Sequence, residues 1–185
     1  VFLIRKRVIE AKKAIVKAVK DKKRVMLKAY TGLGKTRAAI KIAQDWEGRV
    51  VIIEPLQLIV SSEAEKHPGV ATLTGNVDRD DVDVARNAKI VMVTLDQFWK
   101  LGGTIGPSDL LIYDEAHYLP FNHDWKSRDN SEHINAVTYA VEHHPYVLGM
   151  TATPPPLRYD KWHHLHVKHP KGTKQKITPI IGQDR

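Results

Sequence analysis

The sequence contains no cysteine and no apolar run long enough to cross a membrane. Without thiols, the chain can form neither disulfide bonds nor thiolate metal sites, which is compatible with a reducing compartment. The longest β-branched run, residues 50–53, is followed by Glu54 and Pro55, whereas a membrane-spanning helix needs about 20 apolar residues. We therefore expect an intracellular, cytoplasmic protein with no membrane partner.

Acidic residues are few relative to basic ones. The 185 residues include 29 Lys and Arg against 21 Asp and Glu, which gives a formal charge of +8 and an isoelectric point near 9.6. A net positive charge attracts partners that carry phosphates, so nucleic acid is an expected partner. The alternative is a basic surface that is merely solvated.

The chain length fits one α/β domain with a buried sheet and is short for two domains. Short apolar runs predict strands, and helix-capable segments lie between them. The predicted strands are 24–28, 50–53, 71–73, 90–93, 110–113 and 146–150, and the predicted helices are 4–19, 35–45, 56–66, 95–101 and 131–144. This alternation predicts an α/β fold of three layers, with helices on both faces of a mostly parallel central sheet.

The segment AYTGLGKT at residues 29–36 follows a predicted strand and opens a predicted helix, which is the context of a phosphate-binding P-loop. Glycines let successive N–H groups point at phosphate oxygens, and the helix N-terminus adds partial positive charge. We expect Lys35 to reach the β and γ phosphates and Thr36 to ligate Mg²⁺. The predicted nucleotide-binding residues are Thr31, Gly32, Leu33, Gly34, Lys35, Thr36 and Arg37. A non-functional glycine-rich turn is the alternative.

Asp114 and Glu115 directly follow the predicted strand 110–113. They therefore lie at the carboxyl end of a buried strand, where open α/β sheets bind ligands. We expect Asp114 to hold Mg²⁺ together with Thr36, and Glu115 to orient or deprotonate the attacking water. With Lys35, these two carboxylates are the predicted catalytic residues. The alternative is an acid pair that stabilises a helix N-terminus.

Thr151-Ala152-Thr153 follows the predicted strand 146–150 in the same way. Its hydroxyl groups can sense the nucleotide from the carboxyl edge of the sheet, so we assign Thr151 and Thr153, with His117, to coupling. A simple turn before the prolines that follow is the alternative.

Taken in chain order, AYTGLGKT, DEAH and TAT resemble motifs I, II and III of the superfamily-two helicases, and specifically the DEAH-box and viral helicase branch. Looser matches to the loops that follow motif I in that family occur at 54–58, 73–75 and 93–94. Those loops contact the sugar-phosphate backbone in the family. The resemblance therefore implies four nucleic-acid-binding residues, namely Pro55, Leu56, Gly75 and Thr94.

This resemblance implies a RecA-like P-loop NTPase domain that hydrolyses ATP with Mg²⁺ and moves along or unwinds DNA or RNA, with a single strand as the expected substrate. Family members usually read adenine with an upstream glutamine, but none precedes Gln44, so an unselective NTPase also fits. The arginine finger of the family lies in a second RecA-like domain and has no counterpart after Thr153. We therefore expect weak activity alone, and completion by a second domain or by another copy in trans.

Three prolines at 154–156 are expected to end regular structure. We therefore expect a RecA-like ATP-binding domain at 1–156 and a basic His/Lys-rich tail, or the start of a linker to a second domain, at 157–185. Within residues 157–185, apolar and polar residues alternate at 162–168, which indicates a strand. A metal site is less favoured there, because no cysteine or acidic ligand accompanies the histidines. The chain is expected to be a fragment or a shortened relative of the family.

Two other functions compete with a helicase motor. One is a nucleotide-dependent nucleic-acid-binding or regulatory module with little turnover. The other is a P-loop packaging or remodelling ATPase that acts on protein. The four residues Lys35, Thr36, Asp114 and Glu115 favour an enzyme over a regulatory module.

Overall fold

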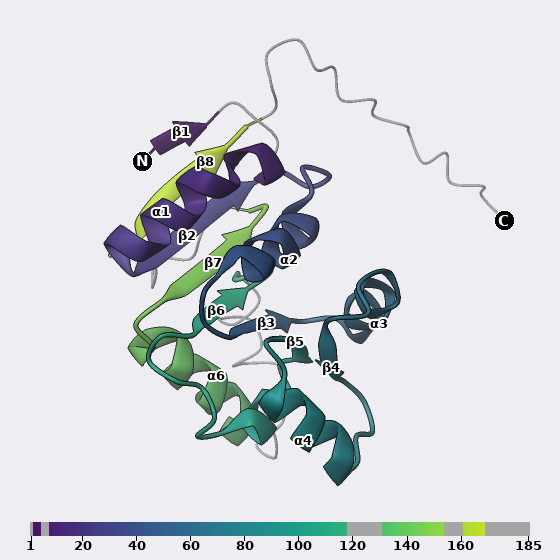
Figure 1. The fold of residues 1–185 in the computed structure, drawn as a ribbon. Helices are drawn as coiled ribbons and strands as arrows, with labels where there is room; N and C mark the ends of the chain where they lie inside the picture. Colours follow the sequence, from purple (N-terminus) through teal and green to yellow (C-terminus); the bar gives the residue numbers. More distant parts are fainter. Residues whose placement is uncertain (1, 5–7, 118–130, 154–160, 169–185) are drawn as a thin grey trace, which may run out of the picture.

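The computed structural model describes residues 2–4, 8–117, 131–153 and 161–168. At its centre lies one eight-stranded sheet in which neighbouring strands all run parallel (Figure 1). In spatial order its strands are β1 (Phe2–Ile4), β8 (His163–Val167), β2 (Arg24–Ala29), β7 (Val147–Thr151), β6 (Leu110–Tyr113), β3 (Val50–Glu54), β5 (Ile90–Thr94) and β4 (Ala71–Leu73). All six predicted strands are present.

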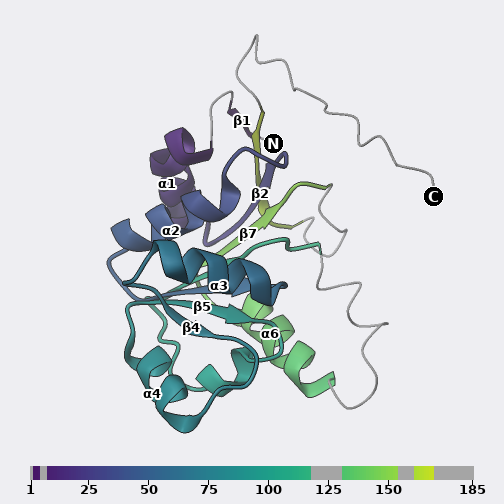
Figure 2. The same ribbon diagram turned by 90° about the vertical axis from the view of Figure 1, so that its right-hand side faces the viewer.

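Helices cover both faces of this sheet, and Figure 2 shows α1 and α2 on the opposite side of the strands from α6. Along β3, Val50 and Ile52 join an apolar cluster with α1 and α2, whereas Val51 and Ile53 join a second cluster with α4 and α6. The helical elements are η1 (Val8–Ala11), α1 (Lys12–Lys22), α2 (Lys35–Asp45), α3 (Gln57–Lys66), α4 (Arg79–Asn87), η2 (Phe98–Leu101) and α6 (Ser131–His143). The predicted three-layer α/β fold is therefore confirmed.

The first predicted helix begins later than expected. Ile4 lies in β1, residues 8–11 form a 3-10 turn, and the α-helix starts at Lys12. The reason is strand pairing, because Phe2 lies in register with Leu165 of β8. The helical spacing of the apolar residues was still informative, since Ile15 and Val19 are fully buried against the sheet.

Two other elements differ from the sequence prediction. Only Phe98–Leu101 of the predicted helix 95–101 is helical, as the 3-10 turn η2. Helix α4 was not predicted, because its sequence is strongly polar and its apolar residues are few, namely Val82, Val84 and Ala85. A capping box begins it: Asp81 N donates to Asp78 Oδ1 at 2.9 Å, and Asp78 N donates to Asp81 Oδ2 at 3.2 Å.

Strand β8 comes from the segment assigned to a tail. It lies between β1 and β2, with Val25 in register with His163 and Ala29 with Val167. The predicted alternation of this segment is confirmed, since Leu165 and Val167 are buried. Residues 163–167 therefore belong to the central sheet, although they were expected to lie in the tail.

None of the helices in the described part of the chain is both long enough and apolar enough to span a membrane.

Candidate nucleotide-binding site

The loop between β2 and α2 has the backbone that a phosphate cradle needs. Gly32 and Gly34 have φ angles of 80° and 75°, in the left-handed region that favours glycine. Gly34 is also the N-cap of α2 and has no side chain that could occupy the first N–H groups of the helix. These N–H groups and the positive end of the helix dipole are therefore available to an anion.

The other predicted residues of this loop differ in exposure. Thr31 and Arg37 are exposed, whereas Leu33 is buried in the core and its N–H donates to the carbonyl of Tyr30 at 3.3 Å. The Leu33 side chain therefore holds the loop against the domain. Lys35 begins α2 and is only 8% exposed.

Two interactions connect α2 to the end of β6. Thr36 Oγ1 donates to Asp114 Oδ2 at 2.9 Å, and Lys35 Nζ lies 3.4 Å from Glu115 Oε1. Strands β2 and β6 are not neighbours in the sheet, but both end at the same edge, as parallel strands must. The predicted catalytic side chains come from segments about 80 residues apart and meet because both segments follow carboxyl ends of strands. This is the edge at which open α/β sheets bind ligands.

Asp114 is almost fully buried and is held at both carboxylate oxygens. Besides the Thr36 bond, its Oδ1 accepts the N–H of Glu115 at 2.9 Å. Burial raises the pKa of Asp114, and the hydrogen bonds from Glu115 and Thr36 and the charge of Lys35 oppose that rise. A carboxylate and a hydroxyl that converge in this way are the oxygen ligands Mg²⁺ prefers, so the residues present fit that ion.

Glu115 has a backbone conformation that is rare for a side chain of its kind. Its φ of 47° lies in the left-handed region, where a residue with a Cβ is strained by on the order of 1–2 kcal/mol. The next residue secures the turn, because Ala116 N donates to the carbonyl of Met150 in β7 at 2.8 Å. This backbone presents the Glu115 carboxylate to Lys35, and such strain is typical of functional turns.

The residues assigned to coupling form a chain of polar contacts that starts at Glu115. His117 Nδ1 lies 3.3 Å from Glu115 Oε2 and 3.1 Å from Thr151 Oγ1. Thr151 Oγ1 in turn lies 3.0 Å from Thr153 Oγ1 and accepts the N–H of Thr153 at 3.1 Å. The end of β7 is therefore connected through one histidine to the carboxylate beside the P-loop.

Sequence reasoning missed Glu54 as a residue of this site. Glu54 ends β3, beside Asp114 of β6 and in register with Thr94 of β5, and it is fully buried. Burial, and then the negative charge of Asp114, raises the pKa of Glu54 to about 10. The carboxyl group is therefore neutral at pH 7. Its signal in the sequence was a single acid directly after a continuous β-branched run; Glu54 was included in the loop match at 54–58 but was assigned no role in the site.

The predicted nucleic-acid-binding residues divide into two groups. Leu56 is half exposed, and the loop of Gly75, with a φ of 65°, lies against the side chain of Gln57, so the turns after β3 and β4 adjoin. Pro55 lies beside Leu56 and is partly exposed. Thr94 is only 3% exposed, so its side chain cannot contact nucleic acid directly unless its surroundings open.

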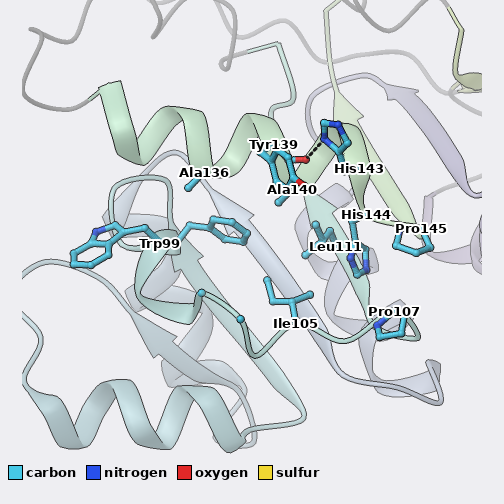
Figure 3. A pocket seen from close by; sticks show the side chains of 13 residues that line it. Trp99, Ile105, Pro107, Leu111, Ala136, Tyr139, Ala140, His143, His144 and Pro145 are labelled. Atoms are coloured by element: carbon cyan, nitrogen blue, oxygen red, sulfur yellow. Dashed lines mark hydrogen bonds between the residues drawn. The ribbon is translucent and has the colours of Figure 1, made fainter.

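A hollow of about 490 Å³ lies elsewhere, between η2, the following loop and α6 (Figure 3). Its lining includes Trp99, Ile105, Tyr139 and His144, and the figure shows their side chains around the opening. None of the predicted nucleotide-binding or catalytic residues lines it. It is therefore a separate feature from the site at the carboxyl edge.

Left-handed glycines before a helix, a P-loop lysine and threonine, and two carboxylates at the adjoining strand end define a RecA-like P-loop domain of the superfamily-two helicase class. Residues 2–156 match the family described as "Type III restriction enzyme, res subunit", and the chain belongs to this family.

Individual relatives agree with this class. Over 152 residues, 82% of this chain and 31% of the relative, the sequence is 29% identical to the DNA 3'-5' translocase XPB2 of Sulfurisphaera tokodaii. The chain therefore spans about a third of that relative's length. The fold is similar to the Hef helicase domain of Pyrococcus furiosus, with a TM-score of 0.61 and 21% identity, over 85% of this chain and 38% of that one.

A further similar fold is the Sulfolobus solfataricus SWI2/SNF2 ATPase core in complex with dsDNA. Its TM-score is 0.54 and its identity 19%, over 81% of this chain and 32% of that one. At these identities the two solved structures bear on fold alone. They confirm the predicted three-layer α/β fold with its parallel central sheet.

Proposed function

We propose that this domain binds ATP with Mg²⁺ and hydrolyses it, as the first RecA-like domain of a DEAH-box type helicase or translocase that acts on nucleic acid. The observation that carries the proposal is the convergence of Lys35, Thr36, Asp114 and Glu115 at one edge of the sheet. Family membership supports a helicase-like ATPase, and the individual roles below are inferred from this geometry.

The P-loop binds the phosphates in this proposal. The backbone N–H groups around Gly32 and Gly34 receive phosphate oxygens, while Thr31 and Arg37 flank them at the surface. The Lys35 ammonium, which is paired with Glu115, turns to the β and γ phosphates when nucleotide binds. Because Lys35 is mostly buried, its attraction for phosphate is screened less by water than that of a surface lysine.

Thr36 and Asp114 would hold Mg²⁺, directly or through water. When bound, the ion neutralises charge that develops on the transferred phosphoryl group. No cluster of three or more His, Cys, Asp or Glu side chains suited to a metal occurs among the described residues. The hydroxyl of Thr36 and the carboxylate of Asp114 suit Mg²⁺, which typically takes one or two protein ligands and completes its shell with phosphates and water.

Release of Lys35 leaves the Glu115 carboxylate free to orient the attacking water and accept its proton. His117 contacts both Glu115 and Thr151, so movement at the end of β7 alters the position of the water-activating carboxylate. We assign His117, Thr151 and Thr153 to this coupling.

Nucleic acid is the proposed track, and Pro55, Leu56 and Gly75 supply its contacts at the same carboxyl edge of the sheet. The names of the relatives mention DNA translocation and a double-stranded DNA complex, which supports DNA as the first substrate to test. A single strand of that DNA is the segment we expect to follow the track. A second RecA-like domain, or another copy in trans, would supply the arginine finger that speeds hydrolysis by roughly 10³ to 10⁵.

Calorimetric titration with Mg·ATP and with Mg·GTP tests this function and its base selectivity. Lys35→Ala should lower affinity severely, whereas Lys41→Ala, on the exposed side of the same helix, should bind as the unchanged protein does. Equal affinity of all three proteins would remove the phosphate site from this loop. Phosphate release that rises when single-stranded DNA is added would support a nucleic-acid motor, and release insensitive to both DNA and RNA would contradict it.

A further inference from the structure

A second hollow, of about 560 Å³, lies on the opposite edge of the sheet from the nucleotide site. It is lined by Lys22, Arg24, Glu142, Lys161, Trp162 and His163. Arg24 and His163 are the first residues of β2 and β8, so the hollow lies at the amino ends of these strands. Because β2 spans about five rises of 3.3 Å between Arg24 and Ala29, the hollow is roughly 17 Å from the P-loop.

The lining of this hollow is dominated by positive charge. Three of its six residues are Lys or Arg, one is a histidine, and one is acidic. Within the described part of the chain, no ion pair is formed by Lys22, Arg24 or Lys161. Burial, and then the positive charge of Lys22, lowers the pKa of His163.

The neighbouring lysine-rich hollow on α1 provides a contrast. There, Lys12 pairs with Asp45, Lys17 pairs with Asp21 at 2.6 Å, and Lys20 pairs with Glu47 at 2.9 Å. Each of these lysines has its counter-charge in the protein, whereas Lys22 and Lys161 are left to neutralise a ligand. The hollow at the amino edge of β2 and β8 therefore differs from the one on α1 in that its lysines form no ion pair among the described residues.

Arg24 gives this hollow a fixed wall. Its Nη2 donates to the carbonyl of Glu142 at 2.5 Å and to the carbonyl of His144 at 3.3 Å, at the carboxyl end of α6. The guanidinium is thereby held in place, and the two lysines at the rim are exposed and free to adapt. The indole of Trp162, which packs against the core, adds a flat apolar surface beside the cations.

We propose that this hollow is a second binding site for the phosphodiester backbone of nucleic acid, with Lys22 and Lys161 contacting phosphates and Trp162 lying against a base. Lysines bind phosphate as point charges, and an aromatic face accepts any base, so the site is not sequence-specific. The inference rests on the proposed function, and it places a contact on the edge of the sheet remote from Pro55, Leu56 and Gly75. Nucleic acid held at both edges would have to pass around the domain.

The test compares two double variants that lose the same charge. Lys22→Gln with Lys161→Gln removes both lysine charges from the proposed site, whereas Lys17→Gln with Lys20→Gln removes two ion-paired lysines of α1. Binding of a fluorescent oligothymidine of about 16 nucleotides is measured by anisotropy from about 50 to 200 mM salt. At about 0.7 per single-strand phosphate, the first variant should reduce the slope of log K against log salt by roughly 1.4, and the second should leave it nearly unchanged.

Further readouts separate the possible failures. Bound oligonucleotide should raise the pKa of His163, followed by NMR, because phosphate offsets the charge of Lys22. If the unchanged protein binds oligonucleotide but the two double variants bind alike, the proposal of a second site is wrong. The same holds if the pKa of His163 does not change on binding. Neither outcome contradicts the proposed motor function. No binding to any nucleic acid would contradict both, and binding to anionic lipid vesicles in place of oligonucleotide would overturn the nucleic-acid assignment. Mg·ATP affinity should be equal in all three proteins.

Discussion

Thr36 at the start of α2 and Asp114 at the end of β6 are joined by a 2.9 Å hydrogen bond between a hydroxyl group and a buried carboxylate. The bond connects the two segments that the proposed chemistry needs in one place. It also keeps the two oxygen atoms close enough to share a magnesium ion or its water. If the proposed Mg²⁺ binds here, this hydrogen bond preorganises its two protein ligands, which lowers the cost of binding.

Replacement of Thr36 tests this arrangement. Thr36→Val keeps the shape but removes the hydroxyl, so Mg²⁺ should no longer strengthen ATP binding, with a loss of about 1–3 kcal/mol, or roughly 5- to 150-fold. Thr36→Ser keeps the hydroxyl and should restore the effect. The measurement is ATP affinity with Mg²⁺ and with EDTA. If the valine variant keeps the full effect of Mg²⁺, Thr36 is not a ligand.

Glu115→Gln tests the chemical step. The amide keeps the shape but cannot accept a proton, so Mg·ATP should still bind while single-turnover hydrolysis falls by about 10²- to 10⁴-fold. Glu47→Gln, at an exposed carboxylate outside the site, is the matched control. Hydrolysis by the Glu115 variant at the rate of that control would remove Glu115 from the mechanism.

Gly34→Ala tests the left-handed backbone of the P-loop. An added Cβ meets no atom within 4 Å, so the cost is conformational, about 1–2 kcal/mol of the free energy of unfolding, with weaker nucleotide binding. Gly69 is equally open but lacks a positive φ, so Gly69→Ala should be neutral or slightly stabilising. Urea unfolding distinguishes the two. A Gly34 variant as stable as the Gly69 variant would show that the loop needs no left-handed residue there.

Glu54 predicts an unusual dependence of stability on pH. Its pKa is 4.5 in the reference state and about 10 when folded, so the folded protein holds a proton that the unfolded chain releases. Stability from this group is therefore fully present below pH 4.5 and is lost as pH rises toward 10, at up to about 1.4 kcal/mol per pH unit.

Glu54→Gln copies the protonated carboxyl and should abolish that loss. The free energy of unfolding is measured in EDTA from acid to alkaline pH. As pH rises, the stability of the variant relative to the unchanged protein should increase. Glu65→Gln, at an exposed carboxylate, should follow the unchanged protein. Parallel profiles for the Glu54 variant and the unchanged protein would mean that Glu54 is ionised in the fold.

Sequence patterns correctly predicted those helices and strands whose apolar pattern lies within the element itself. Helix α2 and strands β4 and β6 occur at the predicted residues, because an apolar run or a helical stripe lies wholly within each. The convergence of Lys35 with Glu115 also followed from strand ends alone. What could not be predicted depends on distant partners: β1 exists because β8 pairs with it, and Glu54 has its raised pKa because three parallel strands bury it beside another acid.

The position of β8 also has a consequence for how the chain folds during synthesis. Among the described strands, β1 pairs with β8 alone, and Phe2 has Leu165 as its partner, so β1 has no strand to pair with until β8 has been synthesised. At about 5–20 residues per second, that interval is roughly 10 to 30 s. From the synthesis of β2 onward, the edge of β2 that will receive β8 is an open strand edge, and such an edge can pair with another chain until β8 covers it.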